Sequence, residues 1–347
     1  MQTSDRRLRA TIRVGFSALL MFLVIVCGCS KRDRSSTESN TGDRATTNLT
    51  LKLGWQPPWA NQGQLVAILK NTDLLAKEGV AVEFVPFTYG GPMVEAAAGN
   101  RLDVIFAGEQ PVLNLISRSA EWRIVARMVR YRSAIVVPPG STLQRLEELK
   151  GKTIATAFGS TTHRDLVRIL NEHGLDGQVK LVSLDQAEHA GVIERGGKEN
   201  WDEIVGIATY DPTIAAAVSN GKARVLYAWP SPGLVAAHKR MIEQQRAQLE
   251  GFLRAYRKSY VRYATAPSEA NRWYSAESRL PLTDRQYAEI AEFEPNLKAQ
   301  SEIDVQIGIT DELLAQTKNN AGIAFKLGIL KSLPDINALT VRALVHP

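Results

Sequence analysis

The chain has 347 residues, of which 44% are hydrophobic and 22% are charged, so it can bury a core large enough for two lobes and is not disordered throughout. Its formal net charge is +6, but the segment before the first apolar run carries +3 of it and only +3 remains for the rest. This is weak for a nucleic-acid-binding protein, and no basic stripe alternates with aromatic residues, so we predict no nucleic-acid partner.

A short apolar run, residues 14–26, follows the basic N-terminal segment. The run is too short to span a bilayer comfortably, which takes about 20 residues, and it is typical of a signal peptide. The residues Val26-Cys27-Gly28-Cys29 that follow resemble a bacterial lipobox. Because small Gly28 precedes Cys29 whereas bulky Val26 precedes Cys27, we predict a lipoprotein signal peptide over residues 1–28 and lipidation of Cys29. An uncleaved short anchor is the alternative.

Residues 29–48 contain almost no apolar side chains and are predicted to form a flexible tether between the lipid and the fold. The expected location is therefore outside the cytoplasm, on the cell membrane and facing the periplasm or the cell exterior. Cys27 and Cys29 are the only cysteines, which excludes a disulfide framework and a cysteine nucleophile in the folded body. The five histidines lack ligand spacing, so we predict neither a metal site nor a cofactor.

From residue 49 onward, short β-type runs alternate with helical segments. Strands are predicted at residues 49–54, 80–88, 104–107, 124–129 and 134–137. This alternation predicts an α/β fold with a mostly parallel sheet covered by helices. The segment 138–141, with sequence PPGS, interrupts the pattern and is the predicted lobe boundary and hinge.

A second unit of the same kind follows the hinge. It contains predicted strands at 149–155, 180–184, 203–208 and 223–227 and predicted helices at 160–173 and 213–219. The segment 229–233, with sequence WPSPG, is predicted to break the chain again, and the remainder is predicted to be helical and to pack on the first lobe. Lobe 1 would comprise residues 49–137 and 229–347, and lobe 2 residues 138–228. An aromatic stripe at helical spacing between residues 249 and 263 is predicted to be core packing.

Polar residues open the predicted helix that starts at residue 160. Ser160, Thr161, Thr162 and His163 follow a strand directly, and the unpaired N–H groups of a helix N-terminus favour a phosphate, sulfonate, carboxylate or nitrate. Ordinary N-capping also explains this composition. A catalytic Ser160–His163 pair is not supported, because a third orienting partner and the nucleophile-elbow motif are lacking.

Three loops should lie near this helix start. The segments 55–61, 89–92 and 107–111 follow predicted strands, and ligands of open α/β sheets bind beyond the carboxyl ends of strands. We therefore expect these loops to converge on a cleft, although their Gly and Pro residues also suit simple turns.

Several stretches, in this order, resemble the solute-binding family of nitrate, taurine, aliphatic-sulfonate and thiamine-precursor importers. They are residues 74–84, 98–104, 149–155 with 159–163, and Tyr210-Asp211-Pro212. The resemblance implies a two-lobed type II periplasmic-binding fold with the ligand between the lobes. It also implies ligand contacts for a set of nine residues: Gln56, Glu109, Ser133, Ser160, Thr161, Thr162, His163, Tyr210 and Asp211. The family often has Trp where Tyr210 stands, and the first loop is bulkier here.

The expected function is capture of a small anionic or zwitterionic solute, such as a sulfonate, nitrate or taurine, for an ABC-type importer. The expected partners are the solute, a permease and an ATPase, with a monomeric chain that is not an enzyme. Glu109 and Asp211 suggest a ligand with an amine or another hydrogen-bond donor beside its anionic group. The alternatives are an enzyme of the same fold, of the pyrimidine-forming or dehydratase type, and a binding module that signals to a receptor.

Overall fold

The computed structural model of the chain describes residues 50–280 and 282–344, which belong to one compact unit that spans residues 47–347. The predicted signal peptide, Cys29 and the tether up to residue 48 lie outside the described residues. None of the helices within the described ranges is long and apolar enough to cross a membrane.

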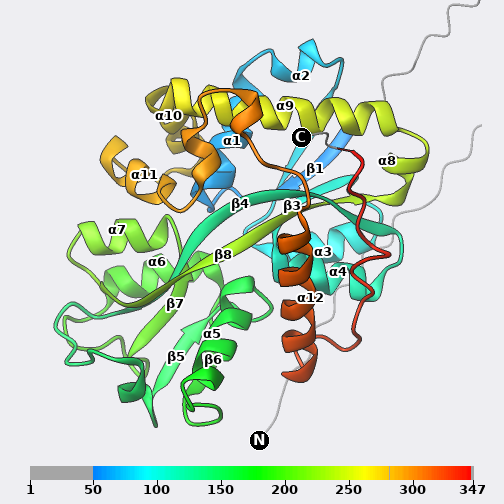
Figure 1. Ribbon diagram of the computed structural model, residues 1–347. Coiled ribbons are helices and arrows are strands. Elements are labelled where there is room, and N and C mark those ends of the chain that lie inside the picture. The colour runs from blue at the N-terminus through cyan, green and yellow to red at the C-terminus, as the bar shows by residue number, and fades with distance from the viewer. Residues whose placement is uncertain (1–49, 281, 345–347) are drawn as a thin grey trace, which may run out of the picture. The chain divides into compact units, whose positions relative to one another are not determined.

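Eight strands form one mixed sheet in the order β2-β1-β3-β8-β4-β7-β5-β6 (Figure 1). The outer strands pair in parallel within two groups, β1 with β2 and β3, and β5 with β6 and β7. The long strands β4 and β8 run antiparallel to each other between the two groups. The predicted α/β class with mostly parallel groups of strands is therefore confirmed. The strands are β1 (Leu51–Trp55), β2 (Val82–Pro86), β3 (Val104–Gly108), β4 (Trp122–Val137), β5 (Thr153–Thr156), β6 (Lys180–Ser183), β7 (Gly206–Tyr210) and β8 (Arg224–His238).

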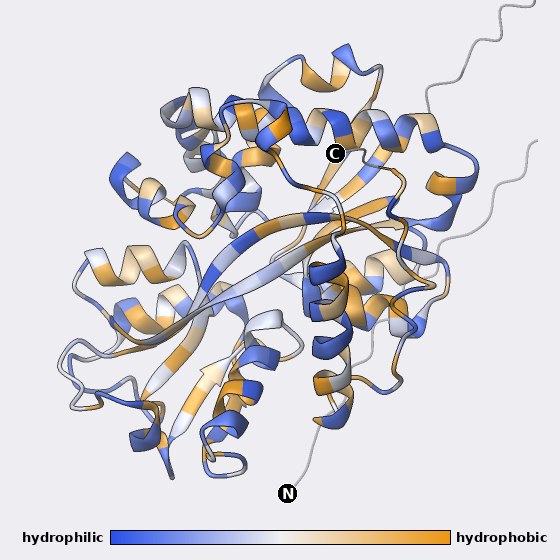
Figure 2. Ribbon diagram, in the orientation of Figure 1, coloured by the Kyte–Doolittle hydropathy of each residue, from blue (hydrophilic) through white to orange (hydrophobic). Residues whose placement is uncertain are grey.

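Helices flank this sheet, and Figure 2 shows hydrophilic and hydrophobic residues together on many of them. The α-helices are α1 (Ala60–Asn71), α2 (Leu74–Lys77), α3 (Gly90–Ala98), α4 (Glu109–Arg118), α5 (Thr161–Glu172), α6 (Gln186–Arg195), α7 (Thr213–Ser219), α8 (Lys239–Glu243), α9 (Arg246–Thr265), α10 (Pro267–Ser278), α11 (Asp284–Ala291) and α12 (Asp311–Lys326). The 3-10 helices are η1 (Leu146–Leu149), η2 (Pro295–Lys298) and η3 (Glu302–Asp304).

The buried apolar side chains separate into clusters that divide the sheet into two halves. Side chains of β1, β3, α1, α4, α9 and α12 pack in clusters of a first half, and those of β5, α5 and most of β7 in clusters of a second half. Tyr210, the last residue of β7, packs with the first half. The strands β4 and β8 contribute to both. Along β4 the change of cluster falls between Tyr131 and Ala134, before the predicted boundary at residue 138, and along β8 it falls between Trp229 and Leu234. The assignment of residue ranges to two lobes remains a prediction.

The predicted break at residues 229–233 is wrong, because β8 continues through it to His238. The residues after the break pair with β3, from Gly233 to Ala237. Pro230 and Pro232 are tolerated inside this strand because the β3 partner begins only at Gly233, which leaves one edge of β8 without a strand there. The two strands predicted at 124–129 and 134–137 are likewise one strand, β4, with shifts of register along it.

Most of the helices after β8 pack on the first half, and α11 also contacts α7 of the second half. Helices α9 and α10 lie against α1, and α12 lies against α4. The aromatic stripe of α9 is core packing, since Phe252, Tyr256 and Tyr260 are each 0% exposed. A buried ion pair fixes the connection after α11, because the Arg127 guanidinium of β4 lies 2.7 Å from the Glu294 carboxylate.

The stability of the fold should depend on pH through His189. Burial in α6 lowers the pKa of His189 to about 4, whereas an unfolded histidine titrates near 6.5. Because the unfolded chain takes up this proton first, the free energy of unfolding should fall as the pH falls from 6.5 to 4, by up to about 3 kcal/mol. In His189→Asn this contribution is absent, so the difference in stability between wild type and variant should shrink over that range. Denaturant titrations at each pH measure it, and parallel pH profiles would contradict the prediction.

Candidate functional site

Four helices begin around one small cavity of about 20 Å³. The residues that precede α1, α3, α4 and α5 all line it. Three of these helices belong to the first half and α5 to the second, so the cavity lies between the halves. The complete lining is Gln56, Trp59, Tyr89, Gly90, Gly108, Pro111, Tyr131, Ala157, Ser160, Thr161 and Tyr210.

The electrostatics of the cavity come from backbone dipoles. Each helix N-terminus carries roughly half a positive charge and has N–H groups without intrahelical partners. The residues that directly precede α1, α3 and α4 form no capping hydrogen bond with their own side chains. At α5, Ser160 Oγ accepts from the N–H of His163 at 3.0 Å. Thr161 Oγ1 accepts from the N–H of Gln110 in the first turn of α4 at 3.0 Å, so one N–H group of α4 is already bonded across the cavity. No lining side chain is a lysine, arginine or carboxylate. This arrangement suits an oxyanion bound by neutral donors.

Three aromatic rings form one wall of the cavity. Trp59 meets Tyr131 edge-on, with ring centroids 4.3 Å apart, and Tyr210 lies 5.7 Å from Tyr131 and 6.1 Å from Trp59. Burial raises the pKa of both tyrosines well above 10, so their hydroxyl groups stay protonated. Such a wall can cover an apolar or planar part of a ligand while the helix tips hold its charge.

The tips of α4 and α5 approach each other closely because residue 108 is glycine. A Cβ atom there would collide with Thr161 Oγ1 and lie 3.2 Å from Tyr131 Oη. Any larger residue at this position would push the N-terminus of α5 away from that of α4.

Of the nine predicted residues, Gln56, Ser160, Thr161 and Tyr210 line the cavity. The loops that follow β1, β2 and β3 also reach it, through residues such as Trp59, Tyr89 and Gly108. Tyr131 and Ala157 were not expected. Ala157 directly follows β5, but no sequence signal marked Tyr131, which reaches the cavity from the middle of β4.

Three more of the predicted residues lie beside the cavity and do not line it. Ser133 Oγ pairs with Thr162 Oγ1 at 2.9 Å, so both hydroxyls are already partnered. The His163 ring stacks on Phe158, with centroids 4.5 Å apart, and its Nδ1 accepts from the N–H of Gly159 at 3.3 Å. Burial lowers the pKa of His163 to about 4, so the imidazole is neutral at neutral pH.

Both predicted carboxylates are bound to arginines. Arg132 donates two hydrogen bonds of 2.8 Å to Asp211, whose pKa is raised by burial against the opposing effect of this arginine. Arg164 lies 2.5 Å from Glu109. Neither Glu109 nor Asp211 lines the cavity, so neither offers a free carboxylate to an amine of the ligand.

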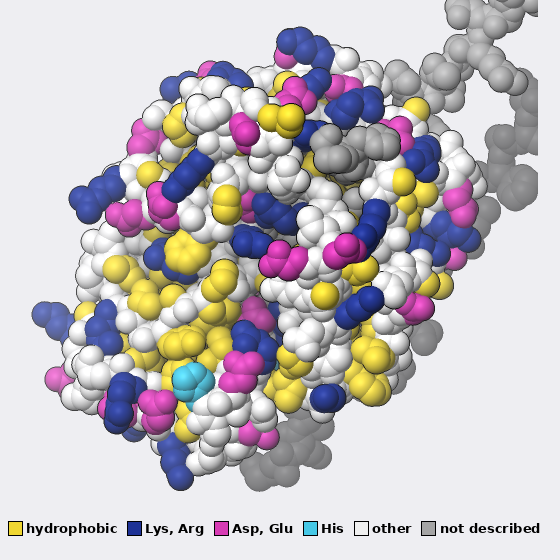
Figure 3. All heavy atoms as spheres, viewed as in Figure 1, with side chains coloured by type: hydrophobic (Ala, Val, Ile, Leu, Met, Phe, Trp, Pro, Cys, Tyr) yellow, Lys and Arg dark blue, Asp and Glu magenta, His cyan; other side chains and the backbone are white. Residues whose placement is uncertain are grey.

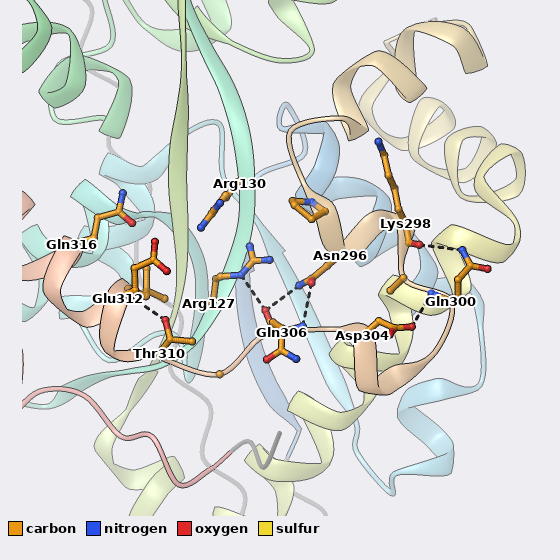
Figure 4. A pocket seen from close by; sticks show the side chains of 14 residues that line it. Arg127, Arg130, Asn296, Lys298, Gln300, Asp304, Gln306, Thr310, Glu312 and Gln316 are labelled. Atoms are coloured by element: carbon orange, nitrogen blue, oxygen red, sulfur yellow. Dashed lines mark hydrogen bonds between the residues drawn. The ribbon is translucent and has the colours of Figure 1, made fainter.

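Larger grooves lie elsewhere on the surface. One of about 480 Å³ is formed by β4, η2 and α12, and Figure 4 shows Arg127 beside Gln306 in it. None of the nine predicted residues lines this groove. On the face in Figure 3, Lys and Arg side chains are interspersed with Asp and Glu. Within residues 50–280 and 282–344, no three His, Cys, Asp or Glu side chains are grouped to hold a metal ion.

A sequence model of one family, described as "ABC transporter, phosphonate, periplasmic substrate-binding protein", matches residues 64–276. The chain belongs to this family. The match covers β2 to β8 and both of the facing helix tips, α4 and α5. The resemblance to solute-binding proteins of ABC importers is thereby confirmed.

Proteins similar to this chain include sulfonate-binding and taurine-binding proteins. A putative aliphatic sulfonates-binding protein of Bacillus subtilis (strain 168) is 26% identical over 214 residues, which are 58% of this chain and 62% of the relative. The taurine-binding periplasmic protein of Escherichia coli (strain K12) is 31% identical over 161 residues, which are 45% of this chain and 47% of that protein. The chain thus matches roughly half to three-fifths of the length of these relatives.

Solved structures share the fold over a longer part of the chain. The alkanesulfonate-binding protein SsuA from Xanthomonas axonopodis pv. citri, bound to MOPS, has a TM-score of 0.69 at 19% identity, over 85% of this chain and 98% of SsuA. The desulfurization enzyme DSZB has a TM-score of 0.59 at 12% identity, over 85% and 97%. The family fold is therefore confirmed, and because one neighbour is an enzyme, the fold alone does not decide the function.

Gly108→Ala should keep the two halves of this family member apart, because the added methyl group meets Thr161. Spin labels at exposed positions, Ala120→Cys in the first half and Asn171→Cys in the second, would report this as a longer distance in the full chain with Cys27 and Cys29 replaced by serine. Gly322→Ala is the control, since its Cβ would meet nothing within 4 Å. An unchanged distance in Gly108→Ala would show that the contact between residue 108 and Thr161 does not limit how closely the halves approach each other.

Proposed function

We propose that this chain is the extracytoplasmic solute-binding component of an ABC-type import system and that it binds a small oxyanion of the sulfonate type. The observation that carries this proposal is the convergence of four helix N-termini on one cavity that no charged side chain lines. The names of the family and of its sulfonate-binding relatives support it. An ABC permease and its ATPase are the proposed partners.

The lining favours an anion with an apolar substituent over one with an amine. A tetrahedral oxyanion can accept from several helix tips at once, and the rings of Trp59, Tyr131 and Tyr210 can cover a short alkyl or aryl group. A buried ammonium group needs a partner, and the nearby carboxylates of Glu109 and Asp211 are both occupied by arginines. Taurine should therefore bind less tightly than an unsubstituted alkanesulfonate.

Binding requires the two halves to separate. A cavity of about 20 Å³ holds about one water molecule, whereas small-molecule sites typically measure about 300–1,000 Å³. The strands β4 and β8 are the natural hinge because both cross between the two groups of core side chains. A solute that contacts helix tips of both halves binds the closed form more tightly and shifts the equilibrium toward it. The permease would recognise that closed form.

We propose binding without chemical change of the solute. The cavity lining contains no carboxylate, imidazole or thiol among the residues that the structure describes. Burial raises the pKa of Tyr131 and Tyr210, which disfavours either phenol as a general base at neutral pH. An enzyme would need a group that accepts or donates a proton at the reacting atoms. This lining supports solute binding over the enzymatic alternative.

Calorimetric titration of the full chain tests the proposed ligand class. Ethanesulfonate should bind with a dissociation constant at least about tenfold lower than that of taurine, because taurine adds an ammonium group without a partner. Thr161→Val should weaken ethanesulfonate binding, since it removes a hydroxyl group from the lining at the α5 tip. Equal affinity for the two solutes would contradict the proposed selectivity, and binding of neither would contradict the proposed function.

We further propose that Cys29 carries the lipid that anchors the chain to the membrane. Cys29→Ser should abolish incorporation of labelled palmitate in a bacterial host and release the protein from the membrane fraction. Cys27→Ser is the matched control and should leave both unchanged. Palmitate labelling that is lost in Cys27→Ser and kept in Cys29→Ser would assign the lipid to Cys27 instead.

A further inference from the structure

Behind the cavity, the guanidinium group of Arg164 lies between two carboxylates. Its Nη1 is 2.5 Å from Glu109 Oε2 and its Nη2 is 2.7 Å from Asp165 Oδ1. The three residues are buried, with exposed fractions of 1% for Arg164, 0% for Glu109 and 3% for Asp165. Arg164 and Asp165 belong to α5 of the second half, whereas Glu109 opens α4 of the first half.

Each carboxylate is also held by neutral groups. Thr317 and Asn320 of α12 donate to Glu109 at 2.8 and 2.7 Å, and Ser231 of β8 donates to Asp165 at 2.8 Å. Both carboxylates therefore have defined positions next to the interface. Within the described part of the chain, Arg164 is the cation paired with both of them.

The effect of Arg164 differs between closed and separated halves. Closure brings Glu109 toward Asp165 and removes both carboxylates from water, and two buried like charges repel strongly at low dielectric. A guanidinium group between them offsets this repulsion and donates to both. When the halves separate, water can solvate Glu109, and the ion pair across the interface no longer matters.

We infer that Arg164 is a positioning residue for closure: it permits the tips of α4 and α5 to meet over the solute by neutralising Glu109 against Asp165. The inference rests on the proposed function, because the contact between the two tips that Arg164 stabilises is the contact that would enclose a solute. The same helix carries Ser160 and Thr161 into the cavity, so the position of Arg164 also sets the position of these two residues.

The test compares Arg164→Met with the double variant Glu109→Gln, Arg164→Met. In the single variant two carboxylates face each other without a cation, so the labels at residues 120 and 171 should report a longer distance in the absence of any solute. The dissociation rate of ethanesulfonate should rise at least about tenfold. In the double variant one carboxylate is gone, and both quantities should return to within about threefold of wild type. Arg164→Lys keeps the charge but not the separate donors to the two carboxylates, so both quantities should lie between those of wild type and Arg164→Met.

The control is the buried ion pair of Arg127 with Glu294, which connects two parts of the first half. Arg127→Met should lower the stability of the chain and leave the distance between the labels unchanged. An unaltered distance in Arg164→Met, or no rescue by Glu109→Gln, would overturn the inference even if sulfonates bind as proposed. If no sulfonate binds, the distance measurement still decides the inference about Arg164.

Discussion

Helix N-termini carry partial positive charges that repel one another, yet this chain holds four of them around one cavity. Three belong to helices of the first half, and the fourth belongs to α5 of the second half. The contact between the tips of α4 and α5 depends on the glycine at position 108 and on the hydrogen bond from the N–H of Gln110 to Thr161. It also depends on the buried ion pair of Arg164 with Glu109 beside the tips. The arrangement leaves N–H groups that an anion can satisfy, which is why solute binding and closure are expected to stabilise each other.

Features that depend on local sequence could be predicted. The start of α5 could be predicted because Ser160 follows a strand and precedes helical periodicity, and the Ser160 hydroxyl caps the helix. The strand-helix alternation predicted the α/β class, since the period of apolar residues is set within each element. The burial of the α9 aromatic stripe followed from the same periodicity. The loops after β1, β2 and β3 reach one cavity because parallel strands end at the same edge of a sheet.

Features that depend on distant partners could not be predicted. The continuation of β8 beyond Trp229 is decided by pairing with β3, which lies more than 120 residues earlier in the chain. Tyr131 reaches the cavity because β4 crosses from one half to the other, and no neighbouring residue signals that crossing. Glu109 and Asp211 looked available to a ligand, but Arg164 and Arg132 bind them in the folded chain. These pairs are separated by 55 residues (Glu109 and Arg164) and 79 residues (Arg132 and Asp211), so the local sequence does not indicate them.

The two prolines of β8 have a consequence for encounters between molecules. Because pairing with β4 continues through Pro230 and Pro232, the positions where they lack N–H groups face the edge of β8 that has no strand beside it. A strand from a second molecule could extend the sheet only by accepting hydrogen bonds from that edge, and here two successive outward donors are missing. β8 can thus remain without a neighbouring strand on this side and still resist edge-to-edge aggregation at high local concentration.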